Sequence, residues 1–235
     1  LQHVEIVDRV IVRLALAHED LRLTTGRADV AAGFAGPFRV VIREIGGLDE
    51  DKTRRTFEKA AKNFGRCFES GMARVPYLAG SVAFYVRIAG DGSTRYAYIT
   101  ESTLGDRATE ECMLAVLRRA SWPQPQGGDE GEARNDFSFE PGDGDARLAT
   151  GSADSLGAPY RGAKGALRSC RSRYGAGPMK ATLYVEPDGR PASIGVSSSD
   201  EKGESAVACV LDTLRGLTFP SRGGGPASKV SVVID

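Results

Sequence analysis

The chain has 235 residues, which is enough for two ordinary domains and more than one small core would organise. Its 31 Lys and Arg balance 31 Asp and Glu, so the chain as a whole has no electrostatic reason to bind nucleic acid or an anionic membrane. With 41% hydrophobic residues, 29 glycines and 11 prolines, it is typical of a turn-rich globular protein and has no apolar run long enough to span a membrane.

Two segments near the start of the chain, residues 10–16 and 38–45, alternate apolar and polar side chains. Such alternation predicts β-strands. Because two or three strands without a helix do not form a core of their own, we expect residues 1–47 to pack on the first module that follows, extending its sheet or covering an edge. An independent β subdomain is the alternative. The chain begins at Leu1, so any targeting segment would have to precede it.

The next part of the chain predicts a helix followed by a β-hairpin. Apolar residues recur at intervals of three and four over residues 51–69, which predicts an amphipathic helix with Cys67 on its buried side. Residues 82–88 alternate with period two, and residues 96–100 are the expected return strand. The Asp91-Gly92 pair between them favours a tight turn, so the two strands should form a hairpin.

A second helix and a closing strand complete this unit. The helix is predicted over residues 106–119, and four residues mark the face that should be buried: Ala108, Cys112, Ala115 and Val116. The proline of Trp122-Pro123 cannot continue a helix, because it lacks the amide donor and clashes with the preceding turn. A last strand is predicted at residues 136–139.

The same order of features recurs in the second half of the chain. A shift of 97 residues places Asp91-Gly92 on Asp188-Gly189, Cys112 on Cys209, Leu117-Arg118 on Leu214-Arg215 and Trp122-Pro123 on Phe219-Pro220. Upstream of the hairpin the shift becomes 103, which places Cys67 on Cys170. A closing strand is again predicted, at residues 229–234. We therefore interpret the chain as a tandem duplication, with modules at residues 48–141 and 142–235.

Each module is predicted to be a two-layer α+β unit, with two helices on one face of a three-stranded antiparallel sheet. Because both cysteines of a module lie on helices that cover the same face, we expect the disulfides Cys67–Cys112 and Cys170–Cys209. Two disulfides indicate an oxidising compartment, although composition alone fits four buried thiols in a cytosolic protein equally well. Zinc is disfavoured, because no CxxC or HxxxH spacing supplies a chelating pair.

A family resemblance covers most of the first module. Its features are the cysteine of the first helix, the leucine and glycine of "LAG" before the strand, the Asp-Gly hairpin, the second cysteine and the exit "WPQPQGG". Together they resemble the AgmX/PglI C-terminal domain of myxobacterial envelope and gliding-motility proteins and, more distantly, the C-terminal domain of TonB. The second module is similar but lacks the "PxLxG" connection and the second proline of the exit.

The resemblance implies a non-enzymatic interaction or scaffold module in a bacterial cell-envelope machine of the gliding-motility or transport type. It implies a periplasmic location, free or attached to the inner or outer membrane through a preceding segment, and other envelope proteins as partners. A TonB-like energy transducer domain is the alternative. A cell-wall-acting enzyme or ligand-binding protein is a weaker one.

An open edge of such a sheet can accept an extended peptide as an added strand, because main-chain hydrogen bonds supply affinity. The closing strands are the candidates for this edge, with the residues Asn135, Phe137, Phe139, Val230, Val232 and Ile234. The alternative is that these strands only close the fold. Nucleic acid is not expected as a partner.

No catalytic constellation is expected. "SDEK" at residues 199–202 has the spacing of a serine–lysine nucleophile, but the repeat places it in a linker before a helix. "GGGPASK", which ends at Lys229, lacks the glycine that precedes the lysine of a phosphate loop. His3 and His18 have no partner at a metal or triad spacing, and "GDGD" at residues 142–145 lacks the remaining ligands of a calcium loop. We therefore expect no enzymatic activity, metal or cofactor.

Overall fold

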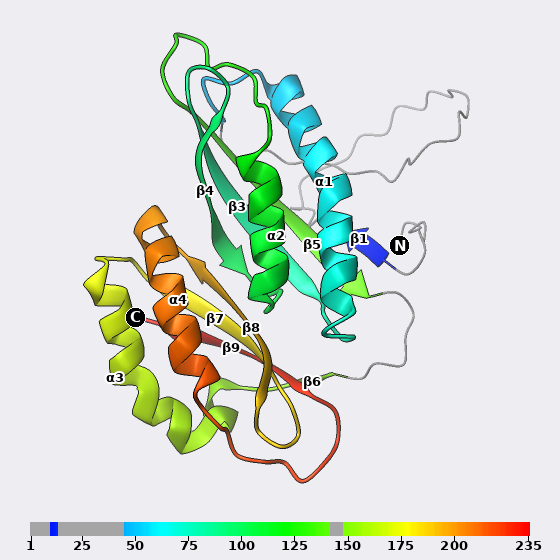
Figure 1. The fold of residues 1–235 in the computed structure, drawn as a ribbon, viewed down its shortest axis with the longest axis vertical. Helices are drawn as coiled ribbons and strands as arrows, with labels where there is room; N and C mark the ends of the chain where they lie inside the picture. The colour runs from blue at the N-terminus through cyan, green and yellow to red at the C-terminus, as the bar shows by residue number, and fades with distance from the viewer. Residues whose placement is uncertain (1–9, 14–44, 142–147) are drawn as a thin grey trace, which may run out of the picture.

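The chain folds into two α+β units, each with two helices on one face of a β-sheet (Figure 1). The structure is a computed structural model and describes residues 10–13, 45–141 and 148–235. The α+β class predicted from the sequence is confirmed. In Figure 1 the first unit lies above the second, and the two helices of each unit lie side by side over its sheet.

The first unit runs in the order helix, hairpin, helix, strand. Its elements are α1 (Glu50–Met72), β3 (Gly80–Ile88), β4 (Thr94–Ser102), α2 (Arg107–Arg118) and β5 (Gly131–Pro141). Both helices begin after an aspartate that caps a free amide of the first turn. The carboxylate of Asp49 accepts from the N–H of Lys52, and that of Asp106 accepts from the N–H of Thr109.

The second unit has the same order of elements. They are α3 (Gly157–Arg173), β7 (Met179–Val185), β8 (Pro191–Ser198), α4 (Glu201–Arg215) and β9 (Ser228–Ile234), preceded by the short β6 (Ala149–Thr150) and the 3-10 helix η1 (Ala153–Leu156). The cap of α4 again is an aspartate, because the carboxylate of Asp200 accepts from the N–H of Gly203 at 2.9 Å.

In each sheet the first strand of the hairpin is central and the closing strand pairs with its other side. β3 lies between β4 and β5, β7 lies between β8 and β9, and all four pairings are antiparallel. Both sheets are larger than the predicted three strands. β1 (Val10–Arg13) and β2 (Ile45–Gly46) pair antiparallel with β5, and β6 pairs parallel with β9. The rest of the two predicted N-terminal strands lies outside the described residues.

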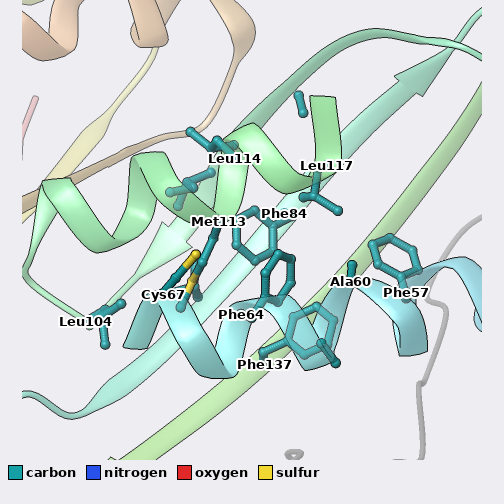
Figure 2. Packing of buried hydrophobic residues seen from close by; sticks show 14 of the residues in the cluster. Phe57, Ala60, Phe64, Cys67, Phe84, Leu104, Met113, Leu114, Leu117 and Phe137 are labelled. Atoms are coloured by element: carbon teal, nitrogen blue, oxygen red, sulfur yellow. The ribbon is translucent and has the colours of Figure 1, made fainter. Parts of the chain in front are cut away.

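Aromatic side chains fill the core of the first unit between its helices and its sheet. Phe57 and Phe64 on α1 pack against Phe137 on β5, with ring centroids 6.2 and 5.0 Å apart. Figure 2 shows these rings along α1, with Met113 and Leu117 entering from α2. The burial of these large apolar side chains is the main stabilising contribution of the unit.

The buried face of α2 differs from the predicted one. The α2 side chains that are fully buried in the core are Met113, Leu114 and Leu117. Of the residues predicted to face the core, Ala108 and Cys112 are exposed, and Ala115 and Val116 are only partly buried. The prediction was wrong because it weighted small alanines equally with longer side chains. Leu and Met remove more apolar area from water, so they decide the rotation of the helix.

Both predicted disulfides are present. Cys67–Cys112 joins α1 to α2 with a Cα separation of 5.7 Å, and Cys170–Cys209 joins α3 to α4 with a Cα separation of 5.6 Å. Cys112 bonds from an exposed position on α2 rather than from the core. The two bonds are compatible with an oxidising, extracytoplasmic compartment. Within the described part of the chain, no helix has the length and apolar character needed to cross a lipid bilayer.

The two recurring Asp-Gly pairs turn the two hairpins. Gly92 and Gly189 have φ angles of 83° and 89°, a region that favours glycine. Each glycine also lies against the exit of the following helix. The carbonyl of Gly92 accepts from the N–H of Trp122 at 2.9 Å, and that of Gly189 accepts from the N–H of Phe219 at 2.8 Å. The glycine and the aromatic residue that recur with the same spacing are therefore in contact in both units.

Gly189→Ala is expected to lower the free energy of unfolding by about 2 kcal/mol or more. A Cβ at this position would lie 2.0 Å from the carbonyl oxygen of Phe219, and the positive φ disfavours alanine. Urea unfolding monitored by circular dichroism measures the change. Gly162→Ala is the control, because nothing lies within 4 Å of a Cβ on this α3 residue, and a stabilisation of about 0.5 to 1 kcal/mol is expected. Similar effects at both positions would refute this account of the turn.

Candidate interaction surfaces

The side chains predicted at the edge of the first sheet point into its core. Asn135 is 3% exposed, and Phe137 and Phe139 are buried. The backbone edge of β5 is also partly occupied, because β1 pairs with residues 138–141 and β2 pairs with residues 132–133. These three side chains therefore close the fold and are not available to a partner.

The closing strand of the second sheet keeps an open backbone edge, although its predicted side chains are buried. Val230, Val232 and Ile234 face the core, whereas the side chain of Val233 is 60% exposed. On the side of β9 away from β7, β6 pairs only with residues 228–229. The predicted residues thus lie on the strand that has the open edge, but their side chains face the core and only its backbone and alternate residues face outward.

The hydrogen bonds of β6 show which groups face this edge. The N–H of Gly151 donates to the carbonyl of Lys229 at 2.9 Å. Because alternate residues of a strand direct their backbone groups to the same side, Ser231 and Val233 face the same edge as Lys229. The Tyr160 hydroxyl donates to the carbonyl of Val233 at 3.3 Å. No strand among the described residues pairs with Ser231 or Val233 on this side.

The opposite edge of the second sheet is closed by the first unit. Glu110 projects from α2 and is completely buried. Its carboxylate accepts from the Ser102 hydroxyl at 2.6 Å and from the backbone N–H of Val196 in β8 at 3.2 Å. The carboxylate therefore occupies an edge amide that an added strand would otherwise use. Among the described residues, β9 is the edge of this sheet that remains open.

The outer face of the second sheet, away from its helices, receives the end of the first unit. Three hydroxyls donate across this junction: Tyr184 to the carbonyl of Ala79 at 2.9 Å, Thr182 to the carbonyl of Ser102 at 3.3 Å and Ser193 to the carboxylate of Asp106 at 2.7 Å. The Arg107–Glu204 ion pair also joins α2 to α4. The junction is therefore polar and directional. Its residues from the first unit lie just before β3 and at or after the end of β4.

Burial at the junction shifts the pKa of two groups toward neutral pH. It raises the pKa of the Glu110 carboxyl to about 7, and it lowers the pKa of the Lys229 ammonium to about 8. Asp106 is the opposite case. Burial alone would raise its pKa, but hydrogen bonds from Thr109, Ser193 and Arg74 hold that pKa below its usual range. The junction thus contains one carboxyl group with a lowered pKa, that of Asp106, and one that titrates near pH 7, that of Glu110.

Gly195 makes the close approach of the two units possible. A Cβ at this position would lie 2.3 Å from Oε1 of Glu110 and 2.9 Å from the Cα of Gly105. Gly195 pairs with Thr182 in the second sheet, and the corresponding pair in the first sheet is Tyr98 with Tyr85. The large Tyr98 fills the space that Gly195 leaves open.

Three tyrosines form a layer on this outer face of the first sheet. The ring of Tyr85 lies 5.0 Å from that of Tyr98 and 6.0 Å from that of Tyr96, and the guanidinium of Arg87 lies 5.5 Å from the centre of the Tyr96 ring. The strand register brings these three tyrosines together.

A shallow hollow of about 600 Å³ lies beside the tyrosine layer. It is lined by Ser81, Ala83, Phe84, Tyr98, Thr100, Glu101, Arg134, Asn135, Asp136, Ser138 and Ser199. Small hydroxyl side chains at one end of the sheet leave this space open, and Ser199 comes from the second unit. Its lining mixes both charges without a cluster of one sign, so it does not select one ligand class.

Two of the motifs that resembled chemistry lie in places that do not suit that chemistry. Ser199 precedes the cap of α4, and Lys202 lies in the first turn of that helix. Lys229 lies inside β9 rather than at the start of a helix, so "GGGPASK" is not a phosphate loop. His3, His18 and residues 142–145 lie outside the described residues. In the described ranges, no group of three His, Cys, Asp or Glu side chains could hold a metal ion.

Comparisons with family models, with curated proteins and with solved structures find no match to this chain. The functional argument therefore depends on the geometry of the surfaces. Of these, the edge of β9 is a surface with a defined recognition chemistry, since unpaired backbone amides and carbonyls bind an extended peptide.

Proposed function

We propose that this protein is a non-enzymatic interaction component of a bacterial cell-envelope machine, acting in the periplasm. It binds an extended segment of another envelope protein, which adds as a strand at the edge of β9. The observation that carries the proposal is the edge at Ser231 and Val233, where no described strand pairs and the Val233 carbonyl accepts only the Tyr160 hydroxyl. The two disulfides support the oxidising compartment that this location requires.

The surroundings of the edge suit a partner strand. Gly151 already donates to the carbonyl of Lys229, so an added strand would begin where β6 ends and would continue along Ser231 and Val233. The exposed side chain of Val233 offers an apolar contact to the alternate side chains of such a strand. Proteins usually block open edges because they promote aggregation, so an open edge with an exposed valine is typical of a binding site.

Photo-crosslinking in the native envelope tests this proposal. Benzoylphenylalanine at Val233 of the full-length protein is expected to form a covalent adduct with one other envelope protein. The same residue at Ala208, an exposed position on α4, is the matched control and should form no such adduct. Adducts are detected by mass shift and identified by mass spectrometry.

A proline variant separates strand addition from mere proximity. The N–H of Ser231 faces away from β7, so Ser231→Pro removes a donor from the open edge without removing a backbone bond of the β7 ladder. Ser231→Ala is the control for the hydroxyl, which lies 2.9 Å from that of Thr182. The proline variant should keep a cooperative melting transition and lose the Val233 adduct. An adduct that forms equally at Ala208, or that persists with Ser231→Pro, would overturn binding at this edge.

A further inference from the structure

The exposed side of α3 carries positive charge without any acidic residue. Its cations are Arg161, Lys164, Arg168, Arg171 and Arg173, and its sequence contains no Asp or Glu. All of them are exposed except Arg171, which is half-buried. The next acidic residue after Asp154 is Glu186, so the uncompensated stretch extends well beyond the helix.

The cations form one row because their spacing matches that of the buried residues. The core side of α3 consists of Tyr160, Ala163, Leu167 and Cys170, and each is followed directly by one of the first four cations. Both sets therefore have the intervals three, four and three, which keep side chains on one line of a helix. At a rise of 1.5 Å per residue, the row from Arg161 to Arg171 is about 15 Å long.

The charge of this row is not neutralised within the described part of the chain. No carboxylate there forms an ion pair with any α3 cation. Lys164 lies over the ring of Tyr160 at 5.6 Å, and Arg171 donates to the carbonyl of Ala176 at 3.4 Å. The elements that α3 mainly contacts are α4, η1 and β9, and Figure 1 shows it along the flank of the second unit.

α1, the matching helix of the first unit, is different. Its exposed cations are interspersed with Glu50, Asp51, Glu58 and Glu69, and two of them pair with carboxylates, Lys52 with Asp49 at 3.9 Å and Arg54 with Asp51. Similar numbers of cations thus give a mixed surface on α1 and a uniformly positive one on α3. The equal totals of acidic and basic residues in the whole chain conceal this difference.

We propose that the α3 face docks on the anionic phospholipid headgroups of a bilayer. The hollow beside the tyrosine layer and the smaller one between Asp106 and Ser193 are both lined by residues outside α3. A row of long, flexible cations separated by Gly162, Gly165 and Ser169 suits a fluid surface of negative charge. Tyr174, 41% exposed at the end of the helix, is the amphipathic aromatic type that lies at headgroup level.

Co-sedimentation with lipid vesicles tests the proposal on the full chain. Binding to phosphatidylglycerol vesicles is expected, with little binding to phosphatidylcholine vesicles and a steep loss as salt rises. The triple variant Arg161→Gln, Lys164→Gln and Arg168→Gln should lower the partition coefficient at least about tenfold. Its melting temperature should match that of the parent, because the three positions are exposed.

The matched control removes the same charge from α1, as Arg55→Gln, Lys59→Gln and Lys62→Gln. All three residues are exposed. This variant should bind anionic vesicles within about twofold of the parent, because the α3 row is intact. An equal loss in both variants would overturn the assignment to α3. The proposal would also be overturned if the protein did not bind vesicles and its α3 cations instead supported binding to duplex DNA. The β9 adduct at Val233 should survive the α3 substitutions, so the two proposals fail separately.

Discussion

Without the Cys67–Cys112 bond, the protein is expected to lose about 4 kcal/mol of unfolding free energy, because the bond closes a loop of 45 residues in the unfolded chain. A single domain is typically stable by about 5 to 15 kcal/mol, so this loss would remove a large part of the total. The bond joins α1 to α2, and both helices cover the same face of the first sheet. Its loss would therefore free the helix layer from the core it protects.

The double variant Cys67→Ala and Cys112→Ala measures this effect without leaving a free thiol. Urea unfolding gives the change in free energy. Cys170→Ala with Cys209→Ala is the matched comparison, and its loop of 39 residues predicts nearly the same loss. Reductant should lower the stability of the parent by both contributions together. It should have no further effect on a variant in which all four cysteines are replaced by alanine. A double variant as stable as the oxidised parent would show that the bonds do not stabilise the fold.

The second large effect depends on pH and comes from Glu110. Burial raises the pKa of this carboxyl in the folded protein to about 7 from an ordinary value of 4.5. Between these values the folded state binds a proton that the unfolded state has released, so the free energy of unfolding falls as pH rises. The contribution is fully present below pH 4.5 and is lost as pH passes through 7. The total change is about 3 kcal/mol.

Glu110→Gln isolates this contribution, because glutamine keeps the shape of the side chain and does not titrate. Unfolding free energies of parent and variant are compared from pH 5 to pH 8. Lys229, whose folded pKa is about 8, is present in both proteins, so its contribution cancels in the difference. The parent should lose about 2.5 kcal/mol relative to the variant over this interval. Glu101→Gln removes an exposed carboxylate and is the control. Its free energy of unfolding should change with pH in the same way as that of the parent. Parallel curves for Glu110→Gln would mean that Glu110 does not carry the pH dependence.

The position of Glu110 could not be predicted from its own segment. The α2 sequence has an ordinary amphipathic pattern, and a glutamate in it reads as a surface residue. Its partner amide belongs to Val196, 86 residues farther along the chain, and Gly195 leaves the space for the carboxylate. A contact of this kind depends on how the two units meet, and no local periodicity reports that arrangement.

The charge of the α3 face likewise could not be predicted from the composition of the whole chain. Equal totals of acidic and basic residues predicted no attraction to an anionic membrane, and this holds for the average over the chain. A helix aligns residues at intervals of three and four, so the four cations of the α3 row act together while their counter-charges lie on other elements. Reading charge along the predicted helix, rather than over the whole chain, would have found this surface.

Sequence alone determined the order helix, hairpin, helix, strand in both halves of the chain, the cysteine pairs that join the helices, and the Asp-Gly turns. These features follow from local periodicity, turn preference and a repeated spacing, which neighbouring residues carry by themselves. Only the tertiary structure decided which side of α2 is buried, which sheet edge stays open and where Glu110 lies. Burial and edge pairing depend on contacts between distant segments, so no single segment contains that information.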